Sequence, residues 1–141
     1  MIAAQDLMIG DWVMVAECVA DAHFIDYPDK IESIRDGLVG LESDGLETII
    51  ERIAPIPLTA EILEKNGFVK SYGVSDTPPY DKDEEGNMYY SFKGEHKFWG
   101  WWQPDNTYYI PANAMGNIVI KYLHELQHAL RLAGIDITIE L

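Results

Sequence analysis

Near its end the chain reads Tyr122-Leu123-His124-Glu125-Leu126-Gln127-His128-Ala129-Leu130, the stretch from which its organisation can be worked out. Apolar residues recur here with the period of an α-helix, at about 100° per residue. Leu123, Leu126 and Leu130 then share one face, which we expect to pack inward. His124 and His128 fall on the opposite side, so we expect both of them in solvent.

The helix is predicted to cover residues 122–133, because Gly134 is a residue type that readily ends a helix. The run before it, residues 117–121, is short and β-branched. Such a run is compatible with a final strand or with the first turn of the helix, and the pattern alone leaves both interpretations open.

His124, Glu125 and His128 form a His-Glu-x-x-His motif, which places two imidazoles one turn apart on a helix. Such a pair can chelate Zn²⁺ while the glutamate activates a metal-bound water. The extended motif requires glycine, then histidine or aspartate, where this chain has Arg131 and Gly134. We therefore favour no catalytic residue, no metal and no cofactor. The alternative is a small zinc-dependent metallopeptidase or hydrolase, with His124 and His128 as ligands and Glu125 as general base.

The composition is that of a globular protein and disfavours two classes of partner. With 141 residues, 48% of them hydrophobic and 24% charged, the chain can bury a core without a disulfide or metal. Lys and Arg number 10 against 24 Asp and Glu, which gives a net charge of −14. This charge repels phosphate backbones and anionic lipids. We expect neither nucleic acid nor membrane as partner.

Other features favour a cytoplasmic location. The N-terminus carries Asp6 and Asp11 but no basic residue before its short apolar runs, unlike a secretory signal. No stretch approaches the roughly 18 consecutive apolar residues that span a bilayer. Cys18, the one cysteine, cannot form an internal disulfide, and its strand-like surroundings predict a buried, reduced thiol.

Residues 1–56 are predicted to form a small β-barrel, because short apolar runs alternate with turn residues and no helical period is sustained. Asp36-Gly37 and Asp44-Gly45 are strong hairpin signals, since glycine accepts the positive φ of a tight turn. A further turn is expected at Pro28-Asp29. The expected strands cover residues 12–19, 23–27, 30–35, 38–42 and 47–53. So many short strands favour an SH3-like or similar partly open barrel.

Residues 57–141 are predicted to hold a short helix, an antiparallel sheet and the C-terminal helix. Pro55 and Pro57 end the preceding ladder, since proline cannot donate to it. Thr59 is suited to cap a helix that runs through Asn66, and Gly67 is suited to stop it. An acidic loop is expected at residues 75–87, followed by strands at 88–93, 97–103 and 107–110. The predicted fold class is α+β, in two parts that can also pack as one compact unit.

The second sheet is predicted to carry most of the aromatic side chains. Neighbours along a strand point to opposite faces, so only one set can face the core. We predict that the binding surface comprises Trp99, Trp101, Trp102 and Tyr109, because exposed Trp and Tyr dominate binding energetics. The competing interpretation covers both faces, with the C-terminal helix on one side and the barrel or a second copy of the chain on the other.

Three groups of segments together resemble a family of small uncharacterised bacterial proteins that are often associated with prophages or mobile elements. They are Ile9-Gly10-Asp11-Trp12-Val13; Ile56-Pro57-Leu58-Thr59 with Ile62-Leu63 and Gly67-Phe68; and Tyr122-Leu123-His124 with Leu126-Gln127 and Gly134. The resemblance implies no assigned activity and brings no catalytic residues. In the family's helix pattern, His-x-Leu-Gln, His124 is shared and His128 is a departure of this chain, which favours a coincidental His-Glu-x-x-His match.

Taken together, these patterns favour a non-enzymatic protein-interaction module. Its partner is expected to be an unidentified protein or, through self-association, a second copy of the chain. The zinc hydrolase is the first alternative. A carbohydrate-binding module that uses the Trp row is the second.

Overall fold

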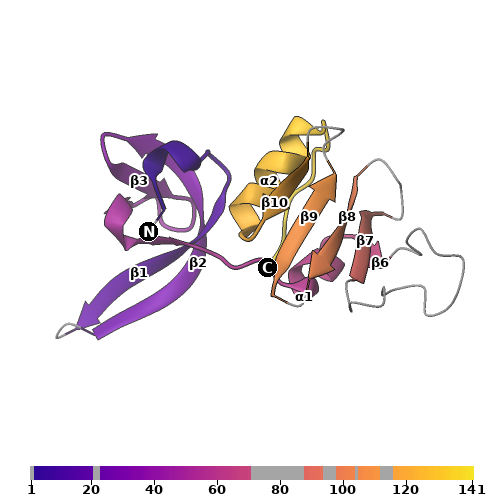
Figure 1. The fold of residues 1–141 in the computed structure, drawn as a ribbon. Helices are drawn as coiled ribbons and strands as arrows, with labels where there is room; N and C mark the ends of the chain where they lie inside the picture. Colours follow the sequence, from indigo (N-terminus) through magenta and orange to yellow (C-terminus); the bar gives the residue numbers. More distant parts are fainter. Residues whose placement is uncertain (1, 21–22, 71–87, 94–97, 104, 112–115) are drawn as a thin grey trace, which may run out of the picture. The chain divides into compact units, whose positions relative to one another are not determined.

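The computed structural model describes residues 2–20, 23–70, 88–93, 98–103, 105–111 and 116–141, which form two antiparallel sheets and a few helices (Figure 1). Helix and strand are both present, as predicted, but strand predominates. The chain divides into two compact units. The first contains the residues up to Ile56 together with Tyr122–Gln127, and the second contains Pro57–Lys121 and His128–Leu141.

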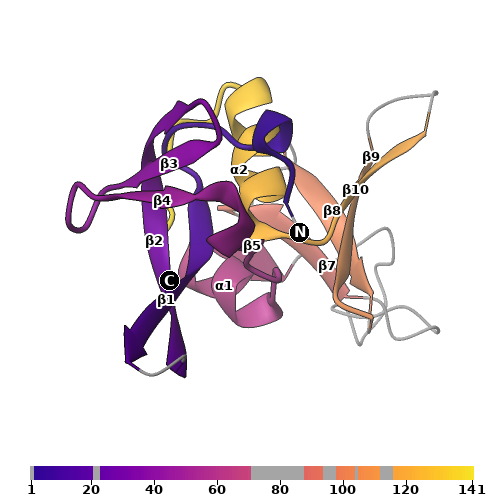
Figure 2. The ribbon, with the colours of Figure 1, turned by 90° about the vertical axis from the view of Figure 1, so that its left-hand side faces the viewer.

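The first unit is built on a sheet in the order β4-β3-β2-β1-β5, in which all neighbours are antiparallel. Its elements are η1 (Ala4–Asp6), β1 (Trp12–Ala20), β2 (His23–Arg35), β3 (Leu38–Leu41), β4 (Glu47–Ile49), η2 (Ile50–Arg52) and β5 (Ile53–Pro55). Strand β2 pairs with β1 over its first part and with β3 over its second. Through β2 the sheet curves into a half-barrel (Figure 2).

The hairpin predicted at Asp36-Gly37 is confirmed. These two residues join β2 to β3 with φ angles of 47° and 79°. Both angles lie in the left-handed region, which Asp tolerates and glycine adopts at no steric cost. Gly45, in the turn before β4, has a φ of 66° for the same reason.

The turn predicted at Pro28-Asp29 is wrong, because β2 continues through both residues. Strand β3 pairs with β2 only from Ile31 onward, so one side of β2 is open at Pro28. A strand tolerates proline where it has such a free edge. Asp29 is buried beside it and accepts hydrogen bonds from the N–H groups of Lys30 and Ser43, at 2.8 and 3.3 Å, and from the Ser43 hydroxyl.

The single strand predicted at residues 47–53 is also wrong. The 3₁₀ turn η2 interrupts it, because β4 and β5 lie at opposite edges of the sheet and the chain must cross between them. At the start of this crossing the Ile50 N–H donates to the Gly37 carbonyl at 3.1 Å.

The core of the first unit is a cluster of buried apolar side chains. It consists of Ile2, Leu7, Val13, Val15, Ile31, Val39, Leu41 and Ile53. Along β1 the buried residues alternate with half-buried ones, as the period of a strand requires. Cys18 lies beyond this buried part of β1, where β5 no longer pairs, and it is exposed. The predicted burial of its thiol is therefore wrong.

The second unit is built on a sheet in the order β10-β9-β8-β7-β6, again antiparallel throughout. Its elements are α1 (Ala60–Lys65), β6 (Phe68–Lys70), β7 (Met88–Phe92), β8 (Trp99–Gln103), β9 (Thr107–Pro111) and β10 (Asn117–Ile120). Helix α2 (Leu123–Leu132) contributes its first residues to the first unit and the others to the second. Strands β6 and β10 extend the predicted sheet at both edges, so the ambiguous run at 117–121 is mainly strand. The acidic loop predicted at 75–87 lies outside the described residues.

Helix α1 begins where the sequence predicts. The Thr59 hydroxyl caps it by accepting a hydrogen bond from the Ile62 N–H at 3.2 Å. Glu64 ties the helix to the sheet, because its carboxylate accepts from the Tyr90 hydroxyl at 2.9 Å. At the other end the Asn66 side chain makes two hydrogen bonds of 2.7 Å with the backbone of Glu140. Helix α1 therefore also holds the C-terminal segment.

One face of the second sheet is packed with aromatic rings. Around Phe68 the ring centroids lie at 5.4 Å for Phe92, 6.0 Å for Phe98 and 6.2 Å for Tyr108. The Tyr108 ring crosses β8 at Gly100, where an added Cβ would stand only 2.8 Å from the ring. This close approach lets the Tyr108 hydroxyl donate to the Tyr90 carbonyl at 2.9 Å. Burial raises the pKa of Tyr108 above its ordinary value.

Candidate functional site

Glu125 of the His-Glu-x-x-His motif serves the first turn of α2. Its carboxylate accepts a hydrogen bond from the Tyr122 N–H at 3.1 Å. The bond satisfies a backbone donor that a helix leaves without an internal partner, as the glutamate of a capping box does. Glu125 therefore has a structural contact at the position where the zinc alternative needs a general base.

His124 is buried, with 4% of its surface exposed, so the prediction that it faces solvent is wrong. Its ring stacks on that of Tyr122, with centroids 6.0 Å apart and planes 13° from parallel. The helical pattern assumes one buried face. The N-terminal part of α2 also buries polar side chains within the first unit, because His124 and Gln127 are only 4% and 7% exposed. His128 is half-buried.

Gln127 is joined to the start of β1 by two hydrogen bonds. Its side-chain nitrogen donates to the Gly10 carbonyl, and its side-chain oxygen accepts from the Trp12 N–H, both at 2.9 Å. Asp11, between these two residues, is fully buried, and its carboxylate accepts from the Met8 N–H at 2.7 Å. We call this arrangement the Gln127 latch.

The latch brings together segments that lie far apart in the sequence. In the same unit the Leu123 N–H donates to the Ile56 carbonyl at 2.9 Å. Parts of all three groups of segments that carry the family resemblance thus meet within the first unit. Sequence reasoning missed the role of Gln127. The available signal was that the segments quoted for the resemblance include Gly10, Trp12 and Gln127, which have no catalytic chemistry in common.

Among the described residues, no three His, Cys, Asp or Glu side chains are grouped so that they could hold a metal ion. The zinc alternative therefore rests on His124 and His128, of which the first is buried and the second half-buried. It stays a prediction.

The predicted aromatic binding residues lie on both faces of the second sheet. Trp102 is buried, with 4% of its surface exposed, and shares the inner face with Tyr108. Strand alternation places it in the core, so we remove it from the proposed contact surface. Trp101 and Tyr109 are half-buried on the outer face. The side chain of Trp99 lies outside the described part of the structure.

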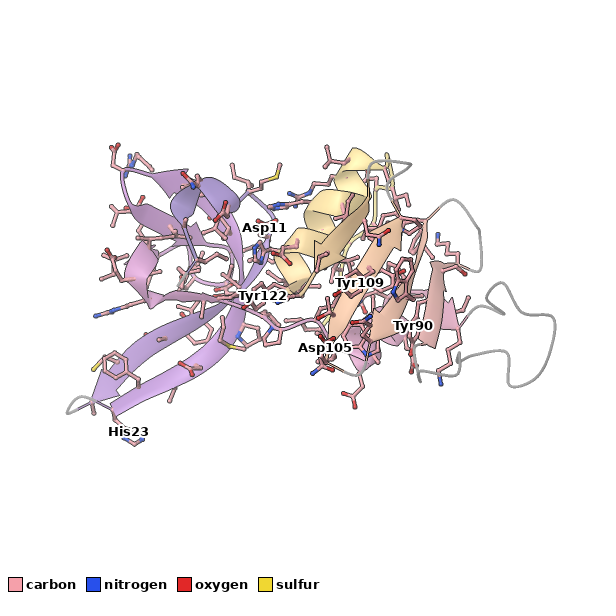
Figure 3. All side chains as sticks on the ribbon, in the orientation of Figure 1. Asp11, His23, Tyr90, Asp105, Tyr109 and Tyr122 are labelled. Atoms are coloured by element: carbon pink, nitrogen blue, oxygen red, sulfur yellow. The ribbon has the colours of Figure 1, made fainter. Side chains whose placement is uncertain are left out.

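Trp101 and Tyr109 form a cross-strand stack, with ring centroids 5.7 Å apart and planes 8° from parallel. Tyr109 lies on β9. For comparison, Tyr90 on β7 is fully buried and belongs to the inner face of the same sheet (Figure 3 labels both residues). Val119 on β10 is in register with Tyr109, and Val69 on β6 is on the same face. Each valine is 46% exposed. We call Val69, Trp101, Tyr109 and Val119 the outer apolar face.

No protein family, curated protein or solved structure matches this chain. Within the described ranges, no helix is both long enough and apolar enough to cross a membrane. The chemistry available at the outer apolar face is burial of large apolar side chains against another surface.

Proposed function

We propose that this protein is a non-enzymatic interaction module that binds a protein partner through the outer apolar face. The observation that carries the proposal is the Trp101–Tyr109 stack, which keeps two large aromatic side chains partly accessible on neighbouring strands. Trp and Tyr supply large contact areas at a low cost in conformational entropy and are enriched among the residues that dominate binding. Val69 and Val119 extend the apolar area toward the two edges of the sheet.

The geometry of the stack favours a protein over a carbohydrate. Stacking on a sugar requires an open aromatic face. Trp101 and Tyr109 are nearly parallel, with centroids 5.7 Å apart, so the side of each ring that is turned toward the other is not an open platform for a sugar. Ring edges and neighbouring valines suit the side chains of a protein partner, which pack against apolar surface from any direction.

Photo-cross-linking tests this proposal. A photo-reactive phenylalanine analogue at position 119 in producing cells should give one defined adduct, which mass spectrometry identifies. Trp101→Ala should abolish the adduct without loss of cooperative melting. The matched control is Leu132→Ala, because Leu132 is apolar and 88% exposed but lies on α2. An adduct of twice the chain mass would assign the partner as a second copy.

Two results would refute the outer apolar face as the binding surface. One is an adduct that Leu132→Ala weakens as much as Trp101→Ala does. The other is a Trp101→Ala protein that no longer melts cooperatively, since Trp101 would then be a core residue.

We also propose that the first sheet is an SH3-like barrel. Its strand order, its long shared strand β2 and the 3₁₀ turn between β4 and β5 support this topology. Packing of the C-terminal helix on the second sheet is a further proposal, supported by Leu130, which is 2% exposed.

We also propose that the protein is cytoplasmic and that it is related to the prophage-associated family. The net charge of −14 and the single cysteine support the first. The shared segments around Gly10, Ile56 and Gln127 support the second.

The zinc alternative makes a separate prediction. It requires stoichiometric zinc in the purified protein, which His128→Ala should remove, and a folded but inactive Glu125→Gln variant. A metal-free preparation that takes up no added Zn²⁺ would dispose of it.

A further inference from the structure

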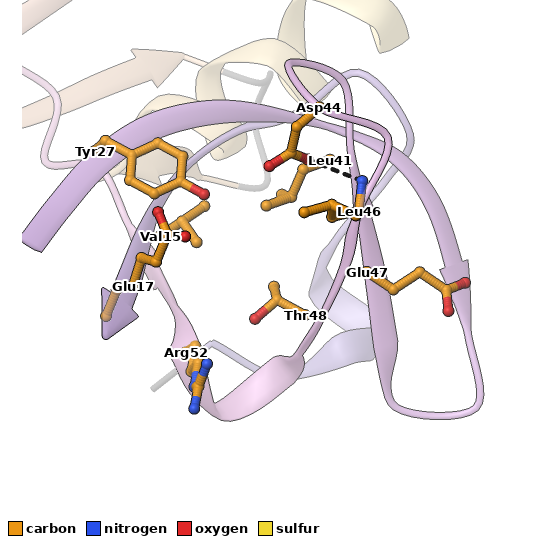
Figure 4. Close-up of a pocket in the computed structure, with 10 residues that line it drawn as sticks. Val15, Glu17, Tyr27, Leu41, Asp44, Leu46, Glu47, Thr48 and Arg52 are labelled. Atoms are coloured by element: carbon orange, nitrogen blue, oxygen red, sulfur yellow. Dashed lines mark hydrogen bonds between the residues drawn. The ribbon is translucent and has the colours of Figure 1, made fainter. Parts of the chain in front are cut away.

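A pocket of about 100 Å³ opens in the first unit, and its lining includes no residue of the His-Glu-x-x-His motif, the Gln127 latch or the outer apolar face (Figure 4). Its lining comes from β1, β2, β3, the following turn, β4 and η2. Val15 and Leu41, each 2% exposed, provide buried apolar surface, and Tyr27 forms a wall. The enclosed cavity that holds benzene measures about 150 Å³, so this smaller, half-open hollow matches the size of one slender side chain.

Two carboxylates give the pocket a negative character. Glu17 and Asp44 both line it, and Figure 4 shows the Tyr27 hydroxyl directed into the hollow that they border. The pKa of Tyr27 is raised, first by burial and then by the negative charges of Glu17, Asp44 and Asp29. Several carboxylates therefore act on the same phenol, and a cation placed beside it would be attracted by the same charges.

The other charged residues of the lining leave this negative character in place. Glu47 forms an ion pair with Arg35 at 3.0 Å, and its side chain points away from the hollow (Figure 4). Arg52 is the one cation of the lining, and Figure 4 places it below Thr48, away from Asp44. Glu17 and Asp44 against Arg52 leave an excess of one negative charge. Glu17 and Asp44 border the hollow from different sides (Figure 4).

We propose that this pocket takes the side chain of a lysine presented by a basic protein partner. The aliphatic stem would lie against Val15 and Leu41, and the ammonium would reach Glu17 and Asp44. Lysine matches this shape because its charge is compact and sits at the end of a flexible apolar stem, whereas the guanidinium of arginine is a broad planar fork. The net charge of −14 favours the approach of a basic partner.

This site belongs to the first unit and the outer apolar face to the second, so either assignment can fail without the other. Nothing in the lysine proposal requires Trp101 or Tyr109.

NMR titration of the full chain with Nα-acetyl-lysine N-methylamide tests the proposal. Saturable shifts are expected in the backbone amide signals of Glu17, Tyr27 and Leu46. The norleucine counterpart, which has the stem but no ammonium, should cause none. Glu17→Gln and Asp44→Asn should each weaken binding about two- to fivefold, the effect of removing one exposed charge pair. Asp44→Asn keeps the side-chain oxygen that accepts from the Leu46 N–H at 2.8 Å.

Glu32→Gln is the matched control, because Glu32 is exposed on β2 and does not line the pocket. It should leave the Kd unchanged. Equal shifts with lysine and norleucine derivatives, equal weakening by Glu32→Gln, or the absence of saturable shifts would each overturn the proposal. Tighter binding of the free diamine cadaverine than of the lysine derivative would overturn the assignment to a protein side chain. If either Glu17→Gln or Asp44→Asn fails to fold, the other variant and the comparison of the lysine and norleucine derivatives still test the proposal.

Discussion

Removal of the Gln127 latch should destabilise the first unit. In Gln127→Met the stem keeps its approximate volume, but both side-chain hydrogen bonds, to Gly10 and Trp12, are lost. A hydrogen bond contributes about 0.5–1.5 kcal/mol net, and a partner left without a bond costs about 1–3 kcal/mol where water cannot replace it. Gly10 and Trp12 are half-buried, so water restores part of this loss. We expect a decrease of about 2–4 kcal/mol in the free energy of unfolding.

Urea denaturation and thermal melting measure this effect. The urea midpoint should fall without a change in m-value, because the surface exposed on unfolding stays the same. The melting temperature should fall by about 8–16 °C for a chain of this length. Gln5→Ala is the control, since Gln5 is an exposed glutamine in η1, and it should stay within about 0.5 kcal/mol of the parent protein.

A second variant tests the direction of the two bonds. Gln127→Glu keeps an acceptor for the Trp12 N–H but places a carboxylate oxygen against the Gly10 carbonyl. Burial and this repulsion raise the pKa of the new carboxyl in the folded state above its unfolded value. Its destabilisation should therefore be large at pH 7 and decrease as the pH falls toward 4. A Gln127→Met protein as stable as Gln5→Ala would refute the latch as a stabilising contact.

The remaining predictions concern stability in the two units. Gly100→Ala should lower the free energy of unfolding by an amount at the upper end of about 1–3 kcal/mol, because its Cβ would clash with the Tyr109 carbonyl oxygen as well as with the Tyr108 ring, and chemical denaturation will show whether it does. The raised pKa of Tyr108 means that the folded state favours the neutral phenol. The contribution of Tyr108 to the free energy of unfolding is therefore complete below the unfolded-state pKa of 10.0 and is lost as the pH rises above it. Alkaline denaturation of Tyr108→Phe should accordingly be less steep than that of the parent; equal slopes would contradict this. Asp29→Ala should cost about 2–3 kcal/mol through its lost bonds to Lys30 and Ser43, and Asp29→Asn less, whereas equal losses in a urea titration would contradict this account.

Local chemistry was sufficient for several elements of this fold. The Asp36-Gly37 hairpin and the Thr59 cap follow from residues that act on their own backbone neighbours. The division of the aromatic residues between two faces follows from the strand period, although the sequence could not say which set faces the core. The tertiary structure assigns Trp102 to the core and Trp101 to the outer face.

Tertiary structure alone decided what depends on segments distant in the sequence. Pro28 was expected in a turn, yet it lies within a strand because no neighbour pairs on its open side. The run before α2 became strand because β9 offers it a partner. The lysine pocket is lined by several strands and turns and has no linear signature.

The burial of His124 and Gln127 likewise could not be predicted from the sequence of residues 122–130. The helical period of this stretch correctly predicted a helix with Leu123, Leu126 and Leu130 buried. The period could not predict that His124 would be buried and that Gln127 would hold the backbone at Gly10 and Trp12. Helical periodicity reports one apolar face, whereas burial of a polar side chain depends on which distant backbone groups are brought within hydrogen-bonding distance. That information lies in the tertiary packing of the first unit.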